Sequence, residues 1–387
     1  MTPGTRAARR TPRVLAVALT ATAVAALTVT PARADGIRTQ EWALDALHVD
    51  EAWGTTKGDG ITVAVLDTGV DATHPDLEGQ VLPGKDLIGF GAERGDKTWA
   101  DHGTAMSGII AGHGHGHSDG VLGIAPEAKI LPVRVILEDA DPERKRARTE
   151  RANALADGIR WAADHGADVI NLSLGDDSDS AHPEPREDAA VQYALSKGVP
   201  VVASAGNGGQ HGDHVSYPAA YPGVIAVTAV DRYGTRARFS TRRWYATVSA
   251  PGVDVVIANP DRKYYEGWGT SAAAAYVSGA VALVRAAHPD LNPAQIKQLL
   301  TETAQDSPAT GRNDDLGAGL VDPAAAVKKG AVAEPAAGDR ATYTKRYFGP
   351  GPEGHASTGT GSWLPWTATA AGAALVAAAV ILWRRRA

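Results

Sequence analysis

Short apolar runs alternate with helical patterns through most of the chain. Runs rich in β-branched residues lie at 61–66, 130–136, 169–174, 199–203, 224–230 and 247–248. Apolar positions at helical spacing occupy 153–165, 188–196 and 293–303. Strands that alternate with helices predict βαβ units, whose mostly parallel sheet is covered by helices on both faces. We therefore expect an α/β domain with three layers, α/β/α.

The first 34 residues have a different pattern. An uncharged apolar run from Val14 to Thr30 follows a basic stretch with Arg6, Arg9, Arg10 and Arg13, and the segment ends in Pro-Ala-Arg-Ala. A basic region, an apolar region and a small-residue site predict a signal peptide over 1–34, cleaved between Ala34 and Asp35. An uncleaved N-terminal anchor is the alternative.

A second apolar segment, 363–383, holds no charged residue. As a helix rising ~1.5 Å per residue it would span about 30 Å, the thickness of a hydrocarbon core. Tryptophans at both ends are typical of membrane interfaces, and three arginines follow at 384–386. The positive-inside rule then predicts a single-pass cell-membrane protein with an extracellular body and a basic cytoplasmic tail at 384–387. A buried helix of a soluble protein is the alternative.

The remaining boundaries follow from composition. Gly, Pro, Ala, Ser and Thr dominate residues 331–362, which predicts a flexible stalk. Residues 35–60 are too few to bury a core of their own. We expect them to wrap onto the folded domain, which extends over 61–330, through Trp42, Leu44, Leu47 and Trp53.

Charge and cysteine content exclude several classes of protein. The 387 residues carry a formal net charge of -6, but residues 1–34 contribute +5 and the tail +3, which leaves -14 for the body. An acidic body argues against nucleic-acid binding, which needs a basic surface. The absence of cysteine excludes a disulfide scaffold, thiol catalysis and Cys-ligated metals.

Four polar residues stand where a parallel sheet places its active site, at strand ends and helix starts. Asp67 ends an apolar strand, His102 begins a helix rich in small residues, Asn207 follows a strand, and Ser271 precedes an Ala-rich helix. Each has an ordinary explanation taken alone, such as a turn for Asn207 or a helix cap for Ser271. The functional interpretation of Ser271 is a nucleophile whose backbone amide lies at a helix N-terminus, where an oxyanion is favoured.

Taken together, these residues follow the chain order Asp, His, Ser of the subtilisin arrangement of the catalytic triad. The blocks Val-Leu-Asp-Thr-Gly-Val, His-Gly-Thr-Ala-Met-Ser-Gly and Gly-Thr-Ser-Ala-Ala-Ala-Ala-Tyr-Val-Ser-Gly surround them. On these blocks the chain resembles the subtilisin-like serine proteases, or subtilases, over about residues 60–327.

The resemblance implies a subtilisin-like fold and hydrolysis of peptide bonds through an acyl-enzyme. Ser271 would be the nucleophile, His102 the general base and Asp67 the residue that orients it. Asn207 and the Ser271 amide would form the oxyanion hole. The family's substrate-binding segments correspond to Ser173, Leu174, Gly175, Ala205 and Gly206. No cofactor and no metal is implied. Activity that needs neutral His102 should fall below a pH of about 6–7.

The sequence departs from the family at three positions and carries one competing motif. Met usually follows the nucleophile and Pro comes four residues after it, where this chain has Ala272 and Ala275. Tyr276 replaces a common His and is expected to narrow the approach to Ser271. Histidines alternate at 113, 115 and 117. Such a pattern can chelate a metal, but a solvated surface loop is the favoured interpretation.

The succession of signal peptide, short N-terminal segment, protease, stalk and membrane span resembles the mycosins, membrane-anchored subtilases of type VII secretion systems. This implies a serine endopeptidase outside the cell membrane that processes secreted proteins, with the secretion machinery as a partner. The alternative is a structural scaffold of a secretion complex with incidental protease activity. The lack of cysteine is a departure, because many mycosins carry a disulfide.

Overall fold

The computed structural model describes residues 36–330. The predicted signal peptide (1–34), stalk (331–362), membrane span (363–383) and tail (384–387) lie outside the described residues. They stay predictions.

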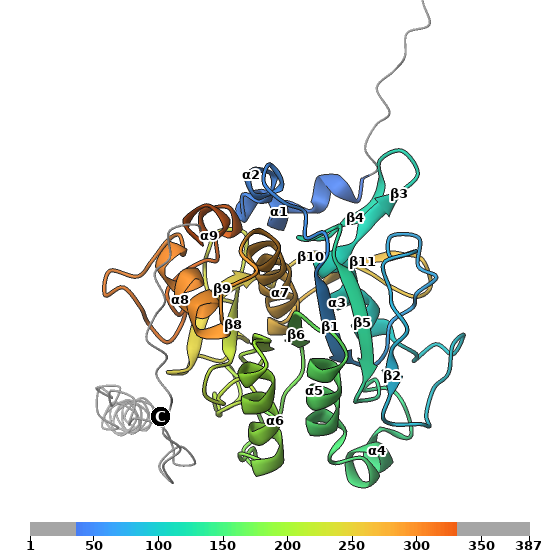
Figure 1. Cartoon of the computed structure of the whole chain (residues 1–387). Helices are drawn as coiled ribbons and strands as arrows, with labels where there is room; N and C mark the ends of the chain where they lie inside the picture. Colours follow the sequence, from blue (N-terminus) through green and yellow to red (C-terminus); the bar gives the residue numbers. More distant parts are fainter. Residues whose placement is uncertain (1–35, 331–387) are drawn as a thin grey trace, which may run out of the picture. The chain divides into compact units, whose positions relative to one another are not determined.

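A seven-stranded sheet forms the centre of the described domain (Figure 1). Its strand order is β2-β5-β1-β6-β7-β8-β9, and every neighbouring pair is parallel. The strands are β1 (Thr62–Asp67), β2 (Lys85–Asp86), β5 (Lys129–Arg134), β6 (Val169–Leu172), β7 (Val201–Ser204), β8 (Ile225–Val230) and β9 (Ala246–Pro251).

Side chains of each strand alternate between two cores, one on each face of the sheet. In β1, Val63 and Val65 join the core that contains α3 (Asp101–Ala111) and α7 (Thr270–Ala287). Ala64 and Leu66 join the opposite core, with α5 (Ala154–Asp164) and α6 (Pro185–Ser196). The predicted three-layer α/β/α architecture with a mostly parallel sheet is therefore confirmed.

Shorter elements surround the three layers. The core around α7 also takes in α8 and α9, while α4 packs into the core of α5 and α6. The remaining helices are η1 (Arg38–Gln40), α1 (Trp42–Ala46), α2 (Val49–Trp53), α4 (Arg144–Glu150), α8 (Pro293–Thr303) and α9 (Pro323–Gly330). Two antiparallel hairpins pair β3 (His113–His115) with β4 (Asp119–Leu122), and β10 (Val255–Ala258) with β11 (Tyr264–Gly267).

The N-terminal segment packs on the domain through large apolar side chains. Leu47 is fully buried in the core that contains α7, and Trp42, Leu44 and Trp53 are partly buried against it. The indole of Trp53 donates a 2.8 Å hydrogen bond to the carbonyl of Ile124. These contacts tie the segment to the fold although it has no core of its own.

One helix within residues 36–330, α7, is long and apolar enough to cross a membrane by length and composition. It is mostly buried, and it packs against the sheet. Burial on all sides is what makes a core helix apolar all round. The predicted span at 363–383 is a different segment.

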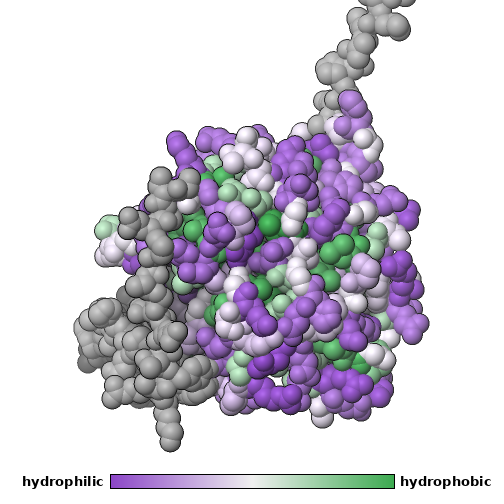
Figure 2. Space-filling view, viewed as in Figure 1, coloured by the Kyte–Doolittle hydropathy of each residue, from purple (hydrophilic) through white to green (hydrophobic). Residues whose placement is uncertain are grey.

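The face of the domain seen in Figure 2 is predominantly hydrophilic. Hydrophobic residues interrupt it in small separate areas between polar ones.

Candidate active site

The carboxyl ends of three neighbouring strands bring the candidate residues to one edge of the sheet. Asp67 ends β1, Ser173 follows β6, and Asn207 comes three residues after β7. Helices α3 and α7 begin at the same edge, with His102 and Ser271 as their second residues. The order of the strands and the starts of the two helices therefore bring residues from five elements together at one edge.

Asp67 and His102 form a close pair. Nδ1 of His102 lies 2.9 Å from both carboxylate oxygens of Asp67. The Asp67 side chain is fully buried, whereas the His102 side chain is 33% exposed. Asp67 also accepts a 2.7 Å hydrogen bond from the amide of Thr68. The carboxylate is thus fixed on one side and faces the imidazole on the other, which leaves Nε2 of His102 on the accessible side of the ring.

A glycine makes this pair possible. A Cβ on Gly103 would lie 1.9 Å from the carbonyl oxygen of Gly69 and 3.2 Å from Cβ of Asp67. Helix α3 can approach β1 this closely because position 103 has no side chain. The small residues that the sequence showed around His102 therefore allow the close packing that was expected of them.

Opposing influences set the pKa of His102. Burial of the ring lowers it, whereas the charge and hydrogen bond of Asp67, with further contributions from Glu138 and Asp139, raise it, and the net result is a pKa of about 9. The sequence predicts that activity falls below about pH 6–7. With the raised pKa of His102, we expect this fall at a higher, alkaline pH.

Ser271 is anchored on both sides by Ser173. The Oγ of Ser271 donates to the Ser173 carbonyl at 3.0 Å, and the Oγ of Ser173 donates to the Ser271 carbonyl at 2.8 Å. The N-cap of α7 is Gly269, so Ser271 lies inside the first turn and is not the capping residue. Among the hydrogen bonds of the described residues, none joins Ser271 to His102.

Asn207 is oriented by the start of the same helix. Its Oδ1 accepts hydrogen bonds from the amide and from the hydroxyl of Thr270, both at 3.0 Å. Because the Thr270 amide can only donate, the oxygen of the Asn207 side chain must face it, and the NH₂ group points the other way. The Ser271 amide is one of the first amides of α7 and has no acceptor within the helix. Two donors are therefore available beside Ser271.

The candidate substrate-binding residues line two adjacent strand exits. Gly175 is exposed and Leu174 half-buried, while Ala205 and Gly206 are buried. A Cβ on either glycine would crowd Ser216, at 2.9 Å from its Oγ for Gly175 and 3.1 Å from its Cβ for Gly206. Beyond these strand exits, beside Asn207, a pocket is lined by Asp177, Ser178, Asp179, Gly208, His211 and His214.

The departures from the family motif lie inside the core. Ala272, Ala275 and Tyr276 are all buried on α7. Tyr276 therefore packs within the fold, and burial raises the pKa of its hydroxyl. The expectation that it narrows the approach to Ser271 is wrong, because the helix turns its ring inward.

The alternating histidines belong to a hairpin instead of the expected loop. His113 and His115 lie in β3, and Nδ1 of His115 lies 2.6 Å from Oδ1 of the fully buried Asp76. Asp76 also accepts from the Val121 amide and the Tyr264 hydroxyl, each at 2.9 Å. Within residues 36–330, no group of three or more His, Asp or Glu is arranged to hold a metal ion. The sequence did not single out Asp76, because it is 39 residues from His115.

The sequence pattern did not indicate Glu138 as a neighbour of His102 either. Its Oε1 accepts a 2.9 Å hydrogen bond from the amide of His102, although the two are 36 residues apart. No local motif marks this residue, and its place follows from the pairing of β5 with β1.

The chain is similar to known proteins in sequence and in fold. Residues 58–319 match the model of the subtilase family, Peptidase_S8. The chain is 39% identical over 307 residues to fervidolysin of Fervidobacterium pennivorans, covering 72% of this chain and 42% of that protein. It is 41% identical over 265 residues to the thermophilic serine proteinase of Bacillus sp. (strain AK1), covering 68% of this chain and 61% of that protein.

A solved structure, MycP1 from the ESX-1 type VII secretion system, is similar with a TM-score of 0.64 and 32% identity. The alignment covers 74% of this chain and 85% of MycP1. The predicted likeness to the subtilases and to the mycosins is thereby confirmed. The chain spans 42% and 61% of the length of the two curated relatives.

Proposed function

Because the chain belongs to the subtilase family, we propose that it is a serine endopeptidase with Asp67, His102 and Ser271 as its catalytic triad. The observation that carries the proposal is the assembly of these side chains at one sheet edge, with His102 2.9 Å from buried Asp67. Helix α7 presents Ser271 and its free amide beside the oriented side chain of Asn207.

In this mechanism Oγ of Ser271 attacks the carbonyl carbon of the scissile peptide bond. Nε2 of His102 takes the Ser271 proton, and the buried carboxylate of Asp67 stabilises the imidazolium that forms. The NH₂ group of Asn207 and the amide of Ser271 donate to the developing oxyanion. His102 then gives the proton to the leaving amine, and water, activated by the same ring, hydrolyses the acyl-enzyme ester.

One movement is required before the attack. The hydroxyl of Ser271 donates to the Ser173 carbonyl, so it must rotate about χ1 to donate to His102. Ser173 holds the Ser271 backbone through a separate bond from its own Oγ, which such a rotation leaves intact. The nucleophile can therefore turn while its main chain stays in place.

The substrate is a polypeptide in an extended conformation. Residues 173–175 and 205–206 follow neighbouring parallel strands, and the exposed Gly175 offers free backbone groups at the surface. An extended peptide can add to such an edge through main-chain hydrogen bonds. The pocket beside Asn207 would then take a side chain of the bound peptide.

A fluorophosphonate probe tests the proposal, because it reacts with an activated serine. The wild-type chain should be labelled and should cleave peptides, and Ser271→Ala should lose both properties, with kcat/KM reduced by about 10⁶-fold. Ser196→Ala is a matched control, because Ser196 is exposed on α6 and its hydroxyl donates to the Tyr193 carbonyl, and it should still be labelled. A folded wild-type chain that takes up no probe would refute the proposal.

We further propose that the enzyme is anchored in the cell membrane and acts on proteins exported by a type VII secretion system. The likeness to MycP1 from the ESX-1 type VII secretion system supports this. The apolar segment 363–383 with its three following arginines supports the anchor.

A further inference from the structure

Helix α3 begins without a capping side chain of its own. Its N-cap residue is Ala100, in the left-handed region at φ 59°, and alanine has no side-chain oxygen to accept from the first amides. The amide of His102 donates instead to Oε1 of Glu138 at 2.9 Å, and the amide of Gly103 donates to Oγ1 of Thr68 at 3.1 Å. The helix start that carries His102 is therefore capped by residues from outside the helix.

These two capping groups belong to one network. The hydroxyl of Thr68 accepts from Gly103, which leaves its proton to be donated to the carboxylate of Glu138. The amide of Thr68 donates to Asp67, the partner of the His102 ring. Asp67, Thr68 and Glu138 thus hold His102 by its side chain and its main chain together.

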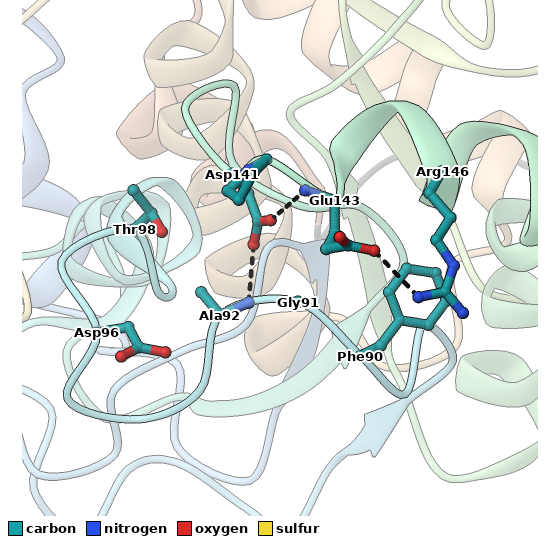
Figure 3. A pocket seen from close by; sticks show the side chains of 9 residues that line it. Phe90, Gly91, Ala92, Asp96, Thr98, Asp141, Glu143 and Arg146 are labelled. Atoms are coloured by element: carbon teal, nitrogen blue, oxygen red, sulfur yellow. Dashed lines mark hydrogen bonds and ion pairs between the residues drawn. The ribbon is translucent and has the colours of Figure 1, made fainter.

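Glu138 itself stands on a braced turn. The amide of Asp141 donates to the Glu138 carbonyl at 3.0 Å. The buried carboxylate of Asp141 accepts from the amides of Ala92 and Glu143, each at 2.8 Å, as Figure 3 shows. Arg144 pairs with Asp139 at 2.7 Å and also bonds the carbonyl of Leu137. Hydrogen bonds and an ion pair therefore fix the turn from which the Glu138 carboxylate reaches the amide of His102.

We propose that Glu138 is a positioning residue for the hydrolysis: it holds the main chain of His102 in register with Asp67, and its negative charge favours the imidazolium formed in the reaction. This inference rests on the proposed function. The role is distinct from that of Asp67, because Glu138 bonds the amide of His102 and Asp67 bonds the ring.

The charges around the ring agree with this role. The carboxylates that raise the pKa of His102 are Asp67 from β1, and Glu138 and Asp139 from the turn after β5. Burial lowers the pKa of His102, and all three carboxylates raise it. Burial also raises the pKa of Glu138 itself, whereas its bonds from Thr68 and from the His102 amide lower it.

Two substitutions in the full-length chain separate the charge from the position. Glu138→Gln keeps the size of the side chain and removes the charge, so the acid limb of the kcat/KM profile should move about 0.5 unit toward lower pH. Glu138→Asp keeps the charge but shortens the reach, so the limb should stay close to that of the wild type while the plateau falls about tenfold. KM should change little in either variant.

Glu143→Gln is the matched control, since Glu143 pairs with Arg146 on the surface of α4 and does not contact His102. It should leave both the limb and the plateau unchanged. Thermal unfolding shows whether each variant is folded at the assay temperature. With a wild-type chain that is labelled at Ser271, a Glu138→Asp plateau equal to that of the wild type overturns the positioning role. A Glu138→Gln profile that coincides with the wild-type profile overturns the effect of the Glu138 charge. A folded wild-type chain without labelling or activity overturns the proposed function instead.

Discussion

The charges of three nearby carboxylates raise the pKa of His102 and so shift the pH at which its ring accepts a proton. Burial lowers the pKa of His102, but Asp67, Glu138 and Asp139 raise it to about 9. The general base must be neutral, so its active form increases as the pH rises through this value and decreases as the pH falls.

We expect kcat/KM to be low near pH 6.5, the ordinary pKa of histidine, and to rise into the alkaline range. The measurement is a pH series with a peptide substrate whose own charge does not change between pH 6 and 10. Glu143→Gln should follow the same curve as the wild type. A profile that is flat from pH 6.5 upward would contradict the raised pKa.

At this scale the sequence indicated the residues whose place follows from a local pattern. Asp67, His102, Asn207 and Ser271 each end a strand or begin a helix, and the structure places them at one sheet edge. Their catalytic roles stay a prediction. Glu138 was not predictable, because its contact with His102 depends on how β5 and its following turn lie beside β1.

The close approach of helix α3 to strand β1 depends on Gly103, which has no side chain. Gly103→Ala would place a Cβ 1.9 Å from the Gly69 carbonyl oxygen, so the helix must move away and separate His102 from Asp67. We expect kcat/KM to fall about 100-fold, because misplacing a catalytic group by about 1 Å has an effect of that size.

Gly108→Ala in the same helix is the control. Its Cβ would lie 3.2 Å from Cβ of Ala258, a contact that a small shift relieves, and activity should stay within about twofold of the wild type. Fluorophosphonate labelling rates measure the effect on the nucleophile directly. Full activity in Gly103→Ala would show that the close approach is not needed.

Elements with a strong apolar pattern were predictable and weakly apolar ones were not. The buried runs at 61–66 and 224–230 correspond to β1 and β8. The short β2, with both residues exposed, and the hairpin of β3 and β4 lack such runs. Strand β10 has one, Val-Val-Ile-Ala, which the sequence analysis did not identify. These strands exist because tertiary contacts fix them, such as the bond from Tyr264 in β11 to buried Asp76.

For the whole molecule, the sequence predicts a membrane anchor beyond the described domain. Deletion of 363–387 should move the protein from the membrane fraction to the soluble fraction, because it removes the 21-residue apolar segment. Deletion of 384–387 alone is the control and should leave the protein in the membrane fraction. Alkaline carbonate extraction and immunoblotting measure the distribution. Extraction of the full-length chain into the soluble fraction would refute the anchor.

Helix α7 lies at the centre of one core and carries the proposed nucleophile, yet it comes late in the chain. Ser271 is synthesised 169 residues after His102, and the helix it starts packs against strands that were completed long before. A growing polypeptide therefore contains the base and its carboxylate partner but no nucleophile. Because the incomplete chain also lacks the helix that fills one core, it can neither fold fully nor cut proteins around it. The proposed catalytic site is therefore complete only after helix α7 has been made.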